Sequence, residues 1–378
     1  MIFDFFAYFS SVSFPFSVSL SSVLFVIFII IPLLKPKDFF RYAKKFKSIY
    51  IILFLFYLSY LISSLLSPDT LSSLKRGREF LFYLGVPAVS FIFKDFKKKR
   101  NLFKAFSFIT IISVIYSIFR ILNGTATDGR AHGFFLHPLT YAGFLTIPII
   151  FSLGFFLISN KKEKLLYLAL FLILLTGLVL TDSRGVFIAI FVSAFYLIFK
   201  INKRILIPYI LTGFVIIVII MIKNPLGIRS KGERRTSTHK RIELIKAFPD
   251  FFLKRPFFGY GRIHTKEWVK KQKEGEYKKE NLELLYKMVH FHVSYLQILF
   301  FTGIFGFVLL YLFYGNLLFM LHRNSKKSFL SILTLTSLLA FLIHGFFEIN
   351  IFADEILLPL FFFTGLSLED EDNSFLGL

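Results

Sequence analysis

The sequence predicts an all-α, polytopic membrane protein with about twelve transmembrane helices and a large, partly helical external loop. Three observations lead to this fold class. The 378 residues are 56% hydrophobic, and their mean hydropathy of +0.69 is high for a soluble globular chain. The apolar residues form runs close to the roughly 20 residues that a helix needs to cross a bilayer. The runs lack the ten-residue alternation of a membrane barrel, and backbone groups in lipid must pair internally, so helices remain.

The apolar runs define the predicted spans. In chain order they are 2–13 (the weakest), 16–34, 50–66, 79–93, 102–119, 139–158, 165–180, 185–199, 205–222, 293–320, 328–347 and 355–368. The first run is typical of an uncleaved span rather than a signal peptide. These runs predict three regions: helices one to nine with short loops in 1–222, an external loop in 223–290, and helices ten to twelve with an acidic tail in 291–378.

The polar interruptions predict the orientation. One alternating set is short and basic, and it comprises 35–47, 94–100, 160–164, 200–204 and 322–327. Because Lys and Arg accumulate in cytoplasmic loops, this set and both termini are predicted to be cytoplasmic. The basic loop 223–290 falls in the other set, and long loops translocate largely regardless of charge. We therefore interpret the net charge of +22 as an orientation signal, and expect no nucleic-acid partner.

The external loop is predicted to be partly helical. Residues 238–252 and 277–289 have apolar side chains at helical spacing. Between them, Pro256, Gly259 and Gly261 in the stretch RPFFGYG interrupt the pattern.

The predicted topology collects cationic side chains on the outer face of the membrane. They are Arg76, Arg78, Arg130, Arg184, Arg241, His290 and His292. Ionisable groups near membrane depth are costly, which makes them functional candidates. Each has a structural alternative: an arginine can anchor a span end, a cation on a basic loop can simply be solvated, and a histidine can pack at the interface. We interpret His344 and Glu348, near the end of a late span, as interfacial, although Glu348 could instead face a cavity.

The outer-face cations suit group transfer from a lipid-linked diphosphate to a hydroxyl. Arginine binds phosphate oxygens bidentately through its planar guanidinium, and a neutral histidine suits a general base. Arginines can neutralise a leaving diphosphate without a metal. The external loops contain no Asp-x-Asp pair and the chain contains no phosphate-loop motif or cysteine, so we expect no metal, cofactor or disulfide.

Four stretches, in this order, resemble the O-antigen ligase and O-antigen polymerase superfamily. RAHGFFLHPLTYAGFL (130–145) resembles its Arg-x-x-Gly segment, and TDSRGVFIAI (181–190) is similar to its Thr-x-Ser-Arg-Gly span start. RIELIKAFPDFFLKRPFFGYG (241–261) resembles an Arg-led helix that ends in a Pro-x-x-Gly-x-Gly turn. HFHVSYLQILFFTGIFG (290–306) resembles the ligase signature of a histidine followed by Gly-x-x-Gly, with Val293 at a usually polar position.

The resemblance implies a metal-independent, inverting membrane glycosyltransferase at the periplasmic face of a bacterial inner membrane. Its partners would be an undecaprenyl-diphosphate-linked glycan donor, a lipid A–core acceptor and membrane lipid. The implied roles are His292 as catalytic base and Arg184, Arg241 and Arg130 as the donor-diphosphate residues, with His290, Ser183, Arg76 and Arg78 as secondary candidates. The glycines at 303 and 306 predict close packing of the helix that follows.

Two alternatives to the ligase stay open. A polymerase would join repeat units on the same donor, and a transporter or flippase would move an anionic lipid. We disfavour the transporter because the strong charges lie at span ends or outside, whereas transport sites lie near mid-span. Of the two histidines, we favour His292, since positions 290 and 292 point to different faces of a helix unless the segment is extended.

Overall fold

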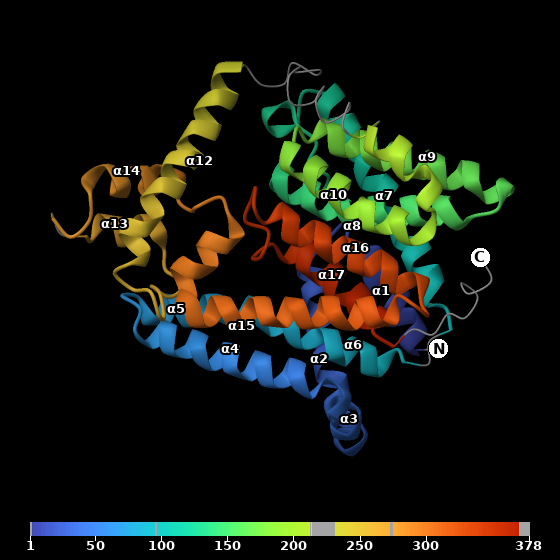
Figure 1. Ribbon diagram of the computed structural model, residues 1–378, viewed down its shortest axis with the longest axis horizontal. Coiled ribbons are helices and arrows are strands. Elements are labelled where there is room, and N and C mark those ends of the chain that lie inside the picture. The colour runs from blue at the N-terminus through green and yellow to red at the C-terminus, as the bar shows by residue number, and fades with distance from the viewer. Residues whose placement is uncertain (1, 95–96, 212, 214–230, 273–274, 370–378) are drawn as a thin grey trace.

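The computed structural model describes residues 2–94, 97–211, 213, 231–272 and 275–369, and within these ranges it contains helices and no strand (Figure 1). The predicted all-helical architecture is therefore confirmed. The α-helices are α1 (Ile2–Ser13), α2 (Val18–Ile30), α3 (Pro36–Ala43), α4 (Lys47–Leu65), α5 (Thr70–Arg76), α6 (Gly85–Ile92), α7 (Lys99–Leu122), α8 (Pro138–Ile158), α9 (Lys161–Leu180), α10 (Arg184–Ile201), α12 (Lys231–Phe252), α13 (Thr265–Lys270), α14 (Lys279–Met288), α15 (Ser294–Asn324), α16 (Phe329–His344) and α17 (Asp354–Ser367).

Several of these helices suit a lipid bilayer. Among the described residues, six are long and apolar enough to cross it: Pro36–Leu65, Lys99–Leu122, Pro138–Ile158, Lys161–Leu180, Arg184–Ile201 and Ser294–Asn324. Two further apolar helices, Val18–Leu34 and Phe329–His344, are shorter. The chain is thus a multi-pass membrane protein by helix length and composition. The count of twelve spans stays a prediction, and most of the predicted span 205–222 and of the acidic tail lies outside the described residues.

The predicted span at 79–93 is a broken element. It consists of a 3₁₀ helix, η3 (Gly77–Leu84), followed by the eight-residue α6. A side chain at Gly85 would collide with the ring of Phe25, so the backbone packs directly against α2 at the break. Six of the eight residues in α6 are buried, which removes the need for a continuous span-length helix at this position.

The core of the helical bundle surrounds α8. This helix is apolar on all sides and almost wholly buried, as expected for a helix in the middle of a membrane bundle. It packs against α9, α7, α16 and α17. Pro138 at its first turn fits the fixed φ of proline, and His137 immediately precedes it. The start of α8 therefore holds the 130–137 segment in a fixed position at the edge of the bundle.

Helices α12, α13 and α14 form a separate layer beside the N-terminal end of α15 (Figure 1). Their apolar side chains make a second cluster, distinct from the bundle core, in which Phe251, Trp268 and Phe300 take part. α12 includes the predicted helix at 238–252, and α14 lies within the predicted helix at 277–289. Both predicted helices of the external loop are confirmed, whereas the short α13 was not anticipated.

The turn after α12 is joined to a kink in α15 by backbone hydrogen bonds. Gly303 has φ 63° and ψ −168°, a conformation that is essentially restricted to glycine. The amides of Tyr260 and Gly261 donate to the carbonyls of Phe300 and Phe301, both at 2.9 Å. A side chain at Gly303 would collide with the backbone of Phe257. The two glycine motifs thus form one junction, and Gly303 serves a close backbone approach within the protein rather than simple helix–helix packing.

We expect Gly303→Ala to destabilise the folded protein by at least about 1–3 kcal/mol, the cost of a disallowed backbone conformation. The measurement is thermal unfolding of the purified protein in detergent. Gly315→Ala is the matched control, because Gly315 lies in the same helix with open space around it. Equal melting temperatures for the two variants would contradict the proposed role of the junction.

Candidate functional site

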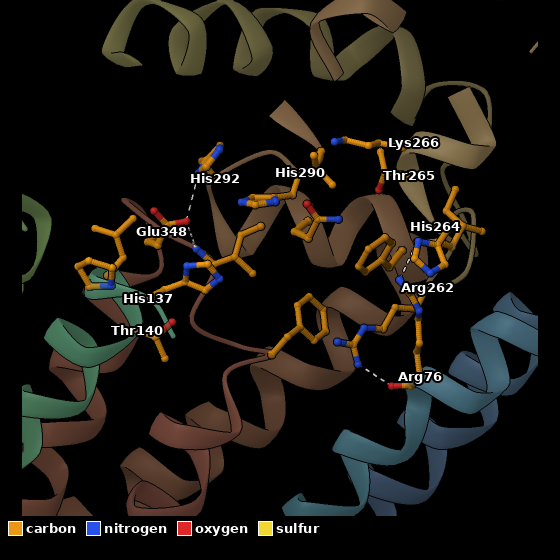
Figure 2. Close-up of a pocket in the computed structure, with 18 of the residues that line it drawn as sticks. Arg76, His137, Thr140, Arg262, His264, Thr265, Lys266, His290, His292 and Glu348 are labelled. Atoms are coloured by element: carbon orange, nitrogen blue, oxygen red, sulfur yellow. Dashed lines mark hydrogen bonds and ion pairs between the residues drawn. The ribbon is translucent and has the colours of Figure 1, made fainter. Parts of the chain in front are cut away.

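A cavity of about 790 Å³ opens beside the start of α8 and the segment before α15 (Figure 2). Five parts of the chain meet there: the end of α5, the segments 128–140 and 262–266, the segment 289–301 around the start of α15, and the loop 348–352 between α16 and α17. The polar side chains that line it are Arg76, Asp128, Arg130, His137, Thr140, Arg262, His264, Thr265, Lys266, His290, His292, Gln297 and Glu348. The cavity is therefore rich in cations and histidines, as the sequence predicts for the outer face.

The segment between α14 and α15 brings both predicted histidines into the cavity. Val289 and His292 have positive φ values of 68° and 54°, so the chain is irregular here and α15 begins only at Ser294. The rings of His290 and His292 lie 4.1 Å apart between centroids. The helical argument for separating the two histidines therefore does not apply, because the segment is not helical.

Glu348 fixes the orientation of His292. The Nδ1 atom of His292 lies 3.1 Å from Oε1 of Glu348. Burial alone would raise the pKa of Glu348, but the hydrogen bond from His292 and the charges of His292 and Arg241 outweigh it and lower the pKa to about 2. An ionised carboxylate can only accept a hydrogen bond, so Nδ1 carries the proton. The other ring nitrogen, Nε2, is then an available proton acceptor.

Arg241 binds the same carboxylate from the other side. Its Nη2 atom donates to Oε2 of Glu348 at 3.1 Å, and its Nη1 atom donates to the carbonyl of Phe347 at 3.0 Å. The side chain comes from α12, whereas Glu348 lies between α16 and α17. Arg241 is thus adjacent to the histidine pair, but much of its hydrogen-bonding capacity is directed at the protein itself.

His290 is a weak base at this position. Burial is the largest cause that lowers its pKa, and together with the charges of His292 and Arg241, which Glu348 opposes, it brings the pKa to about 4. An imidazole with this pKa is neutral at pH 7 and gains little driving force from taking a proton. The helical reason for preferring His292 is lost, and the preference stays a prediction that now rests on the low pKa of His290; both rings line the cavity.

The other predicted arginines lie at different distances from the cavity. Arg130 is buried, lines the cavity and donates from Nε to the carbonyl of Thr181 at 2.7 Å. Arg184 is the first residue of α10 and is not among the lining residues. Its neighbour Gly185 packs against Phe347, which places the start of α10 beside the loop that carries Glu348. Ser183 is the buried residue that precedes α10.

Of the two secondary arginines, only Arg76 lines the cavity, and Arg78 is exposed outside it. Sequence reasoning missed Arg262, His264 and Lys266, which also line the cavity (Figure 2). They directly follow the glycine turn at 259–261, and that position is the one signal that could have marked them.

His290, His292 and Glu348 are the described residues that could hold a metal ion, since their ligand atoms lie within 4.8 Å of one another. Imidazole nitrogen and carboxylate oxygen are ordinary ligands of zinc. Here, however, both carboxylate oxygens already accept hydrogen bonds, from His292, Arg241 and the amide of Ile349. A metal ion would compete with these hydrogen bonds, and with the positive charge of Arg241, for the carboxylate.

The helices and the cavity together define a class: a multi-pass membrane protein with a basic, histidine-bearing site at one edge of its bundle. Residues 169–311 match the family model described as O-antigen ligase. The matched range includes Arg184, Arg241, His290 and His292. The match is consistent with an enzyme that transfers glycans from a lipid-linked donor, with activity of the ligase or polymerase type. No curated protein matches the chain.

We expect Glu348→Gln to lower the free energy of unfolding by about 1–3 kcal/mol at neutral pH, because Arg241 and His292 lose their charged partner. The folded pKa of about 2 lies below the ordinary value of 4.5, so the contribution of Glu348 is complete above pH 4.5 and is lost as the pH falls towards 2. Thermal unfolding at several pH values measures this. The difference between wild type and variant should stay constant from pH 7 to 5 and shrink below pH 4.5; a difference that persists unchanged at pH 3 contradicts it.

Proposed function

We propose that this protein is an O-antigen ligase, which moves a glycan from undecaprenyl diphosphate to a hydroxyl of lipid A–core on the periplasmic face of the inner membrane. The observation that carries the proposal is the chain of contacts from Arg241 through Glu348 to His292 at the cavity. It provides an oriented base beside a cluster of cations. A glycosyl transfer without a metal ion requires both.

His292 is the proposed catalytic base. Its Nε2 atom takes the proton of the acceptor hydroxyl while the hydroxyl oxygen attacks the anomeric carbon of the donor glycan. Glu348 holds the imidazole in the productive tautomer and stabilises the imidazolium that forms. The bond from the anomeric carbon to the diphosphate breaks, its electron pair leaves with undecaprenyl diphosphate, and the configuration inverts.

The cations are proposed to stabilise the leaving diphosphate. Arg130 lines the cavity, and Arg184 and Arg241 flank the loop that bears Glu348. Arginine can offer two parallel N–H groups to phosphate oxygens. In the resting arrangement Arg241 binds Glu348, so part of its role is to fix that carboxylate; Arg130 and Arg184 are then the stronger candidates for direct phosphate contact.

The proposed membrane arrangement follows the charge distribution of the chain. It has twelve spans, both termini in the cytoplasm, and the 223–290 region in the periplasm. This places residues 1–222 and 291–378 in the membrane part and the cavity at its outer edge. The location of the cavity at helix ends and in loops, rather than within spans, supports a surface site over a transport path.

A polymerase that joins repeat units is the alternative function. It uses the same donor and the same base, and the family match is compatible with either activity. The two differ in the acceptor alone, which is lipid A–core for the ligase and a second lipid-linked glycan for the polymerase.

We expect His292→Ala to lower the turnover of glycan transfer by about 10²–10⁴-fold, the usual contribution of a general base, while donor binding stays near wild type. The assay uses purified protein in detergent, lipid-diphosphate glycan, and either lipid A–core or a second lipid-linked glycan as acceptor. His290→Ala is the matched control, since its ring lies next to His292, and it should be impaired far less.

The same assay separates the candidate functions. A product on lipid A–core supports the ligase, and longer lipid-linked glycan supports the polymerase. Retained turnover in His292→Ala removes this residue as the base. Release of undecaprenyl diphosphate without a new glycosidic product would rule out both transferase functions.

We expect a divalent-metal chelator to leave the transfer rate unchanged, because the arginines neutralise the leaving group. The measurement is the initial rate with and without chelator, after dialysis. Inhibition that added zinc or magnesium reverses would contradict the metal-independent mechanism, and His290, His292 and Glu348 would then be the ligands to replace.

A further inference from the structure

The cavity has a second cationic end that the proposed reaction does not use. Arg76, at the last residue of α5, and Lys266, in α13, both line it. Figure 2 shows Arg76 and Lys266 across the cavity from His137, Thr140 and Glu348. We call Arg76 and Lys266 the distal pair.

The backbone around the distal pair is held in place. Arg262 forms an ion pair with Glu79 at 2.6 Å, and the same guanidinium donates to the carbonyl of Arg76. The amide of Arg262 donates to Ser73 at 2.9 Å, and the guanidinium of Arg76 donates in return to the carbonyl of Ile263. The end of α5 and the 262–266 segment are therefore fastened to each other. The charge of Arg262 is neutralised in the process.

The distal pair itself has no neutralising partner. Among the described residues, neither Arg76 nor Lys266 forms an ion pair with a carboxylate, and the recorded ring contact of Lys266 is with Tyr286 at 5.8 Å. The carboxylates that line the cavity, Asp128 and Glu348, come from other segments, and Glu348 is already bound by Arg241 and His292. Two cations on a fixed backbone thus face one cavity, and among the described residues its two carboxylates form no ion pair with either of them, an arrangement that attracts an anion.

We propose that Arg76 and Lys266 form a subsite for a phosphate ester on the acceptor sugar. The inference rests on the proposed function, in which His292 takes the proton of the acceptor hydroxyl. Arginine and lysine together offer a bidentate fork and a point charge, which suit a phosphate group.

The geometry of an inverting displacement assigns this subsite to the acceptor. The attacking oxygen and the leaving oxygen lie on opposite sides of the anomeric carbon. Of the candidate diphosphate residues, Arg130 lines the cavity just before the start of α8, and its bond to the carbonyl of Thr181 joins this side of the cavity to the start of α10, which carries Arg184. The acceptor must then extend from His292 away from that side, and the distal pair lies in that direction (Figure 2).

The test compares Arg76→Gln and Lys266→Gln with the control Lys270→Gln. Lys270 lies in the same helix and makes the same 5.8 Å contact with Tyr286, but does not line the cavity. The acceptor is used intact and after phosphatase treatment. Loss of one charge-assisted contact should raise the KM for the intact acceptor by about tenfold or more, with the KM for the donor unchanged. With the phosphatase-treated acceptor, variants and wild type should be equal.

A direct binding measurement makes the subsite testable without any transfer reaction. Glucose 6-phosphate should bind to the full-length protein in detergent, glucose should not, and the Arg76→Gln/Lys266→Gln double variant should lose the binding. If this holds while no transfer to any acceptor occurs, the anion subsite stands and the proposed function fails. If the variants instead raise the KM for the donor, the distal pair binds the donor diphosphate, and the acceptor assignment is overturned. If the wild-type protein has the same KM for the intact and the phosphatase-treated acceptor, and glucose 6-phosphate does not bind, the proposed subsite is overturned.

Discussion

The Glu348 carboxylate is the interaction on which the candidate site depends. It accepts from His292 on one oxygen and from Arg241 on the other, and these partners come from different segments of the chain. Removing a charge from water is costly unless it is paired, and here the pairing more than offsets the burial, as the pKa of about 2 indicates. One side chain thereby fixes the tautomer of the proposed base, the position of α12, and the path of the loop between α16 and α17.

A second constraint fixes the position of the layer formed by α12, α13 and α14 relative to this carboxylate. Backbone amides of the turn after α12 donate hydrogen bonds to carbonyl groups next to the kink in α15. The kink exists because Gly303 adopts a backbone conformation that other residues rarely adopt. α15 begins at Ser294, whose amide donates to the carbonyl of Gly345 and whose hydroxyl donates to Asn350. The histidine segment, the Arg241 helix and the Glu348 loop are thus tied together through backbone contacts as well as through charge.

The sequence predicts the helical class, because apolar runs are local signals. Short motifs also single out His292 and Arg130, which line one cavity, and Arg241, which binds the carboxylate beside His292; their roles stay predictions. The pairing with Glu348 was not predictable, since the partner lies 56 residues from His292 and depends on how α12 and α16 pack. The non-helical geometry at Val289 and His292 was equally hidden, because positive φ is uncommon for any residue other than glycine. In the sequence, Arg262 and Lys266 look like ordinary cations of a basic loop. Only the folded structure shows that they line the cavity.

The resting position of Arg241 has a consequence for how the donor enters. Its guanidinium makes one bond to Glu348 and one to the carbonyl of Phe347, and a diphosphate that binds Arg241 bidentately must replace at least one of them. Loss of the Glu348 contact would leave His292 as the main partner of that carboxylate. The hydrogen bond from His292 would then strengthen, because the competing donor has gone. In the proposed reaction, donor binding to Arg241 and the orientation of His292 are therefore coupled through a single carboxylate.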